Sequence, residues 1–176
     1  MVAQIDELYE QPHELEPHPD DNLVMFISHI GMGFGQDSPG GGISLNIYFN
    51  GCDIEPKCSG CHNPSMWEHD DGTRMTFREL RTKLHSLLDS SILNLISSVV
   101  FLGGEPLNQP RAVHVINRYC KSLNKMTWLY TGYTYQIVPT NLKKNIDVLI
   151  CGRYDENQLN PDGFPASLNQ VVIRNE

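Results

Sequence analysis

The strongest constraint on the fold is the alternation of short apolar runs with helical patterns after residue 42. Four apolar runs have the length of a strand, at residues 43–49, 99–102, 126–131 and 146–151. Two helical patterns separate the first three runs, one over residues 76–89 and one that begins at Pro110. An order of strand, helix, strand, helix, strand requires right-handed crossovers and favours a mostly parallel sheet. The predicted fold class is therefore α/β.

Both helical patterns carry signals that define their starts and their buried faces. Thr76 and Glu79 have the spacing of a capping box, and Pro110 suits the first turn of the second helix. Leucines and other apolar residues recur at helical spacing, namely Leu80, Leu84, Leu87 and Leu88 in the first helix and Val113, Ile116 and Cys120 in the second. Each helix should therefore pack one face against the sheet.

Chain length limits how far such a sheet can close. A complete barrel of eight strand–helix units needs about 250 residues, whereas this chain has 176. We therefore expect a partial, open (β/α) barrel. Its first strand, residues 43–49 or "ISLNIYF", alternates apolar side chains with Ser44, Asn46 and Tyr48. This alternation predicts a strand with one buried face.

Charge and hydropathy exclude some partners. The formal net charge of −8 argues against nucleic acid, whose binding proteins carry basic surfaces. No apolar run approaches the roughly 18 residues of a membrane helix, so we expect no membrane partner. The N-terminal segment is acidic and polar, unlike a secretory signal, and we expect a cytoplasmic protein. In that reducing compartment, clustered cysteines more often bind metal or take part in chemistry than form disulfides.

The first part of the chain differs in composition from the rest. Residues 1–21 hold three prolines and many acidic residues. They are predicted to form a loosely ordered acidic leader, with a docking strand or helix as the alternative. Residues 22–176 are predicted to form one domain.

The loop that follows the first strand contains three cysteines. Five residues separate Cys52 from Cys58, and two separate Cys58 from Cys61. Structural zinc would need a fourth ligand, for which His62 or His69 is available. "CSGCH" also matches a haem-attachment pattern, and three unrelated thiols are a further possibility. The remaining interpretation is a [4Fe–4S] cluster held by three thiolates, which leaves one iron open for chemistry.

A small molecule bound at an open iron needs a second site that holds it. Gly103 and Gly104 end an apolar run and permit close backbone approach, while Glu105 offers a negative charge to an ammonium group. Thr131 and Gly132 end the next run. Ligands of open α/β sheets bind at the carboxyl ends of the strands, so all five are candidate cofactor-binding residues.

Together these motifs resemble the radical S-adenosylmethionine (radical SAM) superfamily. Within it they resemble the activating enzymes of anaerobic (class III) ribonucleotide reductases, which are glycyl-radical activases. The likeness runs from about residue 35 to the C-terminus, although the family usually has three residues between its first two cysteines. The motifs that carry it are "CSGCHNPSMW", "LGGEPL", "WLYTGYTY", "IDVLICGRYDENQ" and "SLNQVV".

The resemblance implies a fold, two cofactors and a set of site residues. The fold would be a partial barrel of the radical SAM type. The three cysteines would bind a [4Fe–4S] cluster, and S-adenosylmethionine would chelate its open iron and be cleaved reductively to a 5′-deoxyadenosyl radical. Gly60, Cys61 and His62 would line the adenine side of the cofactor, and Gly104 the methionine side.

The resemblance also implies an oxidoreductase with protein partners. The radical would be passed to a glycine of the large subunit of anaerobic ribonucleotide reductase, and a reduced flavodoxin- or ferredoxin-type protein would donate the electron. Three alternatives stay open: an activase of another glycyl-radical enzyme, a small radical SAM enzyme acting on a small molecule such as a deazapurine precursor, and a non-catalytic iron–sulfur or zinc module. His62-Asn63 is more typical of the pyruvate formate-lyase activases.

Overall fold

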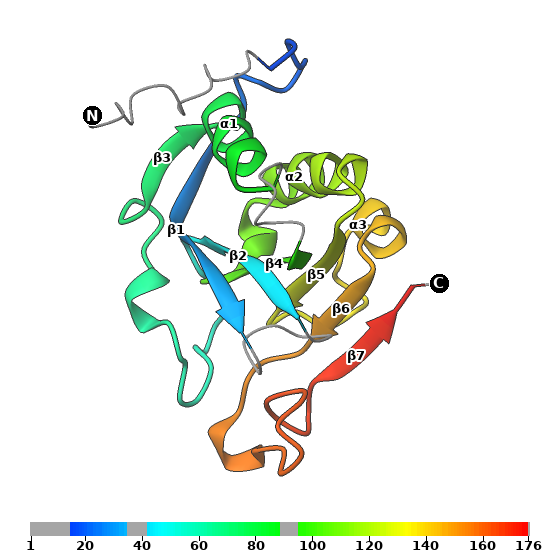
Figure 1. Ribbon diagram of the computed structural model, residues 1–176. Helices are drawn as coiled ribbons and strands as arrows, with labels where there is room; N and C mark the ends of the chain where they lie inside the picture. Colours follow the sequence, from blue (N-terminus) through cyan, green and yellow to red (C-terminus); the bar gives the residue numbers. More distant parts are fainter. Residues whose placement is uncertain (1–14, 35–41, 89–94, 176) are drawn as a thin grey trace, which may run out of the picture.

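The computed structural model describes residues 15–34, 42–88 and 95–175. One seven-stranded sheet runs through the molecule in the order β3-β1-β2-β4-β5-β6-β7 (Figure 1). Its strands are β1 (Val24–Phe34), β2 (Ile43–Phe49), β3 (Thr73–Thr76), β4 (Ile96–Gly103), β5 (Met126–Thr131), β6 (Val148–Cys151) and β7 (Val171–Arg174). The helices are α1 (Phe77–Leu88), α2 (Pro110–Ser122) and α3 (Thr140–Asn145), with short 3-10 turns η3 (Pro64–Met66), η5 (Pro106–Asn108) and η6 (Glu156–Gln158).

The centre of the sheet is parallel and its edges are antiparallel. Strands β2, β4, β5 and β6 pair in parallel. Strands β1 and β3 add to one side and β7 to the other, all antiparallel. The four parallel strands therefore end at the same edge, where the cysteine loop follows β2 and the glycine pair follows β4.

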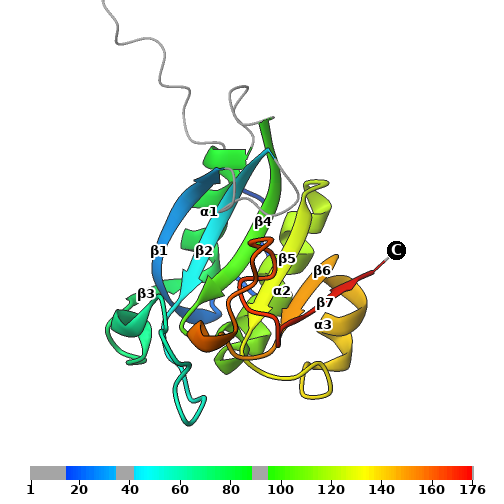
Figure 2. The same ribbon diagram turned by 90° about the horizontal axis from the view of Figure 1, so that it is seen from below.

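Different structures cover the two faces of the sheet. Helices α1 and α2 lie behind the sheet in Figure 2, and residues 152–170 cross in front of it. Leu80, Leu84 and Ile116 are fully buried in the main core with the helix-facing side chains of the strands. A smaller cluster of Val100, Trp128, Val148 and Ile150 lies apart from this core. The Trp128 ring meets Phe164 of the crossing segment in a T-shaped contact at 6.1 Å.

Most of the expected elements are confirmed. The predicted strand over residues 43–49 coincides with β2, and that over 126–131 coincides with β5. Both ends of the capping box are present: the backbone N–H of Thr76 donates to Glu79 Oε2 at 2.6 Å, and the N–H of Glu79 donates to Thr76 Oγ1 at 3.3 Å. In α2, Val113, Ile116 and Cys120 are fully buried as predicted.

The prediction of one buried face for β2 is wrong. Ser44 is fully buried and Asn46 is 3% exposed, although both belong to the polar face of the alternation. The hydroxyl of Ser44 donates to Asn46 Oδ1 at 2.7 Å, so burial does not leave these groups unpaired. Residues 152–170 cross this side of the sheet in Figure 2, and Phe164 lines one cavity with Asn46, an arrangement that the local pattern of β2 does not encode.

The end of the acidic leader that the structure describes contacts α1. Asp21 is 7% exposed and lies 3.0 Å from the guanidinium of Arg81, which is itself buried. Arg81 also donates to the carbonyl of Glu16 at 2.7 Å, and the His18 ring packs edge-on against Phe77. Residues 1–14 lie outside the described residues, so the leader and the domain boundary at residue 22 stay predictions.

The α/β class is confirmed, with a sheet that is parallel at its centre and mixed overall. It is open in the sense that β3 and β7 end the strand order. Among the described residues, no helix has both the length and the apolar character needed to cross a bilayer.

The capping box of α1 gives a test of the fold. Replacing Thr76 with Ala removes the hydroxyl that caps α1 and should lower the free energy of unfolding by about 1 kcal/mol. Thr82→Ala is the control, because Thr82 lies within the same helix and donates only to the preceding turn at Arg78 O. Urea titration of both variants under reducing conditions measures the difference. Equal losses of stability would contradict a specific capping role for Thr76.

Candidate functional site

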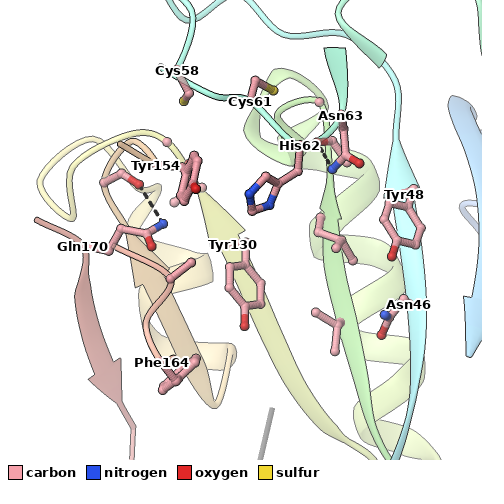
Figure 3. Close-up of a pocket in the computed structure, with 18 of the residues that line it drawn as sticks. Asn46, Tyr48, Cys58, Cys61, His62, Asn63, Tyr130, Tyr154, Phe164 and Gln170 are labelled. Atoms are coloured by element: carbon pink, nitrogen blue, oxygen red, sulfur yellow. Dashed lines mark hydrogen bonds between the residues drawn. The ribbon is translucent and has the colours of Figure 1, made fainter. Parts of the chain in front are cut away.

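A cavity of about 380 Å³ lies at the carboxyl ends of the parallel strands. Figure 3 shows Cys58 and Cys61 at one end of it and Asn46 and Phe164 at the other. Seven of the ten predicted site residues line this cavity: Cys58, Cys61, His62, Gly103, Gly104, Thr131 and Gly132. Cys52, Gly60 and Glu105 are not among its lining residues. The structure therefore brings together three chain segments that sequence reasoning assigned to one site.

Backbone hydrogen bonds hold the cysteine loop against the segment that follows it. The N–H of Gly51 donates to Met66 O and the N–H of Cys52 donates to Trp67 O, both at 3.0 Å. Inside the loop, Lys57 Nζ donates to Cys52 O at 2.7 Å and pairs with Glu55 at 2.8 Å. These contacts fold the five residues between the first two cysteines back onto the start of the loop.

The three thiols are partly accessible, as a metal ligand must be. Cys52, Cys58 and Cys61 are free and half-buried, whereas Cys120 and Cys151 are buried, in agreement with the prediction that the latter two act as small apolar residues. Burial raises the pKa of Cys52 and of Cys58. The indole N–H of Trp67 donates to Cys61 Sγ at 3.4 Å. Binding of a metal group would therefore require loss of the thiol protons at Cys52 and Cys58.

The donor set suits an iron–sulfur cluster better than one ion. Within the described residues, no three His, Cys, Asp or Glu side chains are arranged to hold a single metal ion. This gives no support to the zinc interpretation with His62 or His69. A [4Fe–4S] cluster binds each cysteine to a different iron, so its ligands stand further apart than those of one ion. Three partly accessible thiols in one loop, two of which line the cavity, are compatible with such a cluster.

Packing between the turn at the end of β4 and the cysteine loop requires Gly103 and Gly104. A Cβ atom at Gly104 would lie 2.4 Å from Gly51 O and 2.5 Å from Met66 O, and one at Gly103 would lie 2.3 Å from Phe49 O. Gly103 also has φ +125°, which other residues rarely adopt. The two glycines thus let the turn after β4 contact the backbone of the cysteine loop. The same two residues line the cavity.

Glu105 joins the ends of two neighbouring strands. Its carboxylate accepts hydrogen bonds at 2.8 Å from Leu107 N, the Thr131 hydroxyl and Gly132 N, and the residue is 1% exposed. Burial raises the pKa of Glu105 to about 7, against the opposite influence of these three hydrogen bonds. In this arrangement protein groups occupy the carboxylate that was predicted to meet an ammonium group. Glu105 fixes the Thr131–Gly132 turn at the cavity wall, and its predicted contact with an ammonium group stays a prediction.

Several residues of the site were missed by sequence reasoning. Asn46 and Tyr48 line the cavity from β2, and Tyr154, Phe164 and Gln170 line it from the segment after β6. Tyr154 and Gln170 lie in the "ICGRYDENQ" and "SLNQVV" motifs and Phe164 lies in neither, but nothing local indicated that these segments fold back over the sheet. The Tyr154 and His62 rings lie 4.3 Å apart.

The fold and site together define an α/β protein with a three-cysteine loop beside a cavity. Comparison with protein families agrees with this class, because residues 38–173 match the family described as "4Fe-4S single cluster domain". The chain is 30% identical over 141 residues to the anaerobic ribonucleoside-triphosphate reductase-activating protein of Enterobacteria phage T4, covering 77% of this chain and 86% of that protein. It is also 34% identical over 129 residues to the pyruvate formate-lyase-activating enzyme of Clostridium pasteurianum, covering 71% of this chain and half of the relative.

The chain therefore belongs to the radical SAM family of glycyl-radical activating enzymes, as the motifs predicted, and it is an oxidoreductase of that class. The family match includes all three clustered cysteines, the glycine pair after β4 and the segment that covers the cavity.

The buried Glu105 carboxyl predicts a characteristic pH dependence of stability. Its pKa is raised in the folded state, so its stabilising contribution is complete below about pH 4.5, its ordinary value, and is lost as the pH rises through about 7. The stability advantage of the wild type over Glu105→Gln should therefore shrink across this window. Urea titrations of the iron-free full-length chain at a series of pH values measure it.

Glu79 provides a control, because its contribution to stability should change with pH in the opposite direction. Hydrogen bonds from the backbone and side chain of Thr76 lower the pKa of Glu79. Its contribution should be present above its ordinary pKa of 4.5 and be lost as the pH falls. A wild-type advantage over Glu105→Gln that grows with pH, like that expected for Glu79→Gln, would show that the Glu105 proton is not retained on folding.

Proposed function

We propose that this protein is a radical SAM activase that generates a glycyl radical on an anaerobic ribonucleoside-triphosphate reductase. The observation that carries the proposal is the convergence of Cys58, Cys61 and two glycine-containing turns on one cavity. A cluster at the thiols and a cofactor against the turns would then be in contact. The similarity to the phage T4 activating protein over 86% of its length supports the choice of target.

In this proposal Cys52, Cys58 and Cys61 hold a [4Fe–4S] cluster in a partial barrel of the radical SAM type. When bound, the cluster would supply the electron that cleaves S-adenosylmethionine, and the resulting carbon radical would take a hydrogen atom from a glycine of the partner. The protein's own contribution is to orient the cofactor and to exclude water. A reduced flavodoxin- or ferredoxin-type protein is the proposed electron donor.

The lining of the cavity suits the two ends of S-adenosylmethionine. Gly103, Gly104 and the Thr131–Gly132 turn offer backbone at the wall where we place the methionine end. His62 lies beside Cys61 and against Tyr154, and these rings offer flat surfaces for the adenine, with Gly60 next to them in the loop. Glu105 supports this wall from behind through Thr131 and Gly132.

Cavity size supports a polypeptide as the substrate. A volume of about 380 Å³ is near the lower end of the range of roughly 300–1,000 Å³ for small-molecule sites. One nucleoside-sized cofactor would occupy much of it and leave little space for a second small molecule. A loop of another protein can reach the site from outside, and glycine presents a Cα with no side chain to block the approach.

A second candidate target is pyruvate formate-lyase or a related glycyl-radical enzyme. Two observations favour it, namely the His62-Asn63 pair and the 34% identity to the pyruvate formate-lyase-activating enzyme. The chain spans only half of that relative, which weighs against equivalent partner contacts.

The target is tested by mixing the reduced, reconstituted protein with S-adenosylmethionine and each candidate partner in the absence of oxygen. The expected result is a glycyl doublet in the paramagnetic resonance spectrum with the reductase large subunit, accompanied by 5′-deoxyadenosine. A doublet only with pyruvate formate-lyase would select the second candidate. Cofactor cleavage without a protein radical, combined with turnover of a small substrate, would contradict an activase function.

The ligand assignment is tested independently of the partner. Cys52→Ala, Cys58→Ala and Cys61→Ala should each abolish an intact cluster, because each removes the only protein ligand of one iron. Cys120→Ala and Cys151→Ala are controls, since both thiols are buried in the main core and neither lines the cavity. Iron and sulfide content and visible absorbance after anaerobic reconstitution report the outcome. Loss of the cluster in either control would refute the three-cysteine assignment.

A further inference from the structure

The segment after β6 returns to the cysteine loop and binds it on both sides of Cys58. Arg153 Nη2 donates to Glu55 O at 2.5 Å, three residues before Cys58. The hydroxyl of Ser59, the residue after Cys58, donates to Glu156 Oε1 at 2.8 Å. We propose that residues 153–158 are a clasp that fixes the cysteine loop, and that Arg153 and Glu156 are positioning residues for the iron–sulfur cluster.

Backbone contacts reinforce the two side-chain contacts of the clasp. The N–H of Glu156 donates to Ser59 O at 3.4 Å, and Ser59 pairs with Asp155 in an isolated parallel bridge. The backbone N–H of Tyr154 lies next to the thiol of Cys58. The clasp thus contacts a predicted ligand directly as well as the residues around it.

Gly60 accommodates the clasp. It has φ +68°, and a Cβ atom there would lie 2.5 Å from Glu156 Oε2 and 2.8 Å from Glu156 Cβ. Glu156 therefore occupies the space that a side chain at position 60 would take. Gly60 was predicted to line the adenine side of the cofactor, and the structure gives it this packing function as well.

Residues just before β7 form hydrogen bonds with the clasp. Asn169 Nδ2 donates to Arg153 O at 2.8 Å, and Leu168 N donates to Gln158 O at 2.8 Å. The buried Ser167 hydroxyl accepts from Asp155 N at 3.3 Å. These contacts connect the clasp to the residues immediately before β7, so it is held at several points along its length.

The length of the cysteine loop explains why such a clasp is useful. Ordering a longer loop costs more conformational entropy, and five residues separate Cys52 from Cys58. The clasp fixes positions 55 and 59, so the Cys58 thiol between them is held before the cluster binds. By linkage, cluster binding must stabilise the clasp to the same extent as the clasp stabilises the cluster. This inference rests on the proposed function, since it requires that Cys58 binds the cluster.

The first test measures how fast the reconstituted protein loses iron to an iron(II) chelator without oxygen. Arg153→Met and Glu156→Ala should each release iron about three- to tenfold faster than the wild type, the scale set by one lost hydrogen bond. Asp162→Ala is the matched control, because Asp162 is an exposed acid of the same covering segment. Ser59→Ala should reproduce the effect of Glu156→Ala, and the double variant should show no further increase.

The second test measures cleavage of residues 152–170 by a protease, with and without the cluster. Loading the wild type with iron and sulfide should slow cleavage there, and this protection should be weaker in Arg153→Met and Glu156→Ala. Variants that release iron at the wild-type rate would overturn the proposal. Faster iron release accompanied by equally faster cleavage throughout the chain would also overturn it, because the residues would then only stabilise the fold. Failure of the wild type to assemble any cluster would instead refute the proposed function.

Discussion

The close contact between two backbone turns organises the whole site. The N–H of Gly104 donates to Phe49 O at 2.8 Å and the N–H of Glu105 donates to Gly51 O at 2.7 Å. These bonds join the end of β4 to the start of the cysteine loop at a separation that admits no side chain at either glycine. Because the loop and the turn share one backbone interface, the thiols are positioned by the parallel sheet and not by the loop alone.

Glu105 extends this interface to the next strand. It lies directly after the glycine pair, and its buried carboxylate receives donors from the end of β5. The ends of three neighbouring strands of the sheet are thus linked. The cysteine loop and the glycines join β2 to β4, and Glu105 joins β4 to β5. A carboxyl in this position is protected from water by the same packing that brings the loops together, and this protection is the cause of its raised pKa.

Local sequence signals predicted those elements whose structure is determined by residues close to one another in the chain. The capping box at Thr76, the strand over 126–131 and the cysteine loop all follow from patterns within a few residues, and the first two are confirmed. The burial of Ser44 and Asn46 on the polar face of β2 could not be predicted, because the alternation within the strand does not show what packs over it. The hydrogen bonds of Glu105 could not be predicted for a related reason: its partners at Thr131 and Gly132 come close to it only in the folded sheet. The motifs pointed to residues of which seven line one cavity, and long-range packing determined which of them face it.

The contact between Arg153 and Glu55 joins residues that are 98 positions apart. At a synthesis rate of about 5–20 residues per second, the ribosome needs roughly 5–20 s to add the residues between them. The same interval separates the emergence of the two residues from the ribosome, so for that time the cysteine loop is outside it without the segment that contacts Cys58 in the folded protein. Its thiols are then open to oxidation and to stray metal ions. A nascent chain of this kind therefore depends on its surroundings, and not on its own fold, to deliver reduced cysteines to cluster assembly.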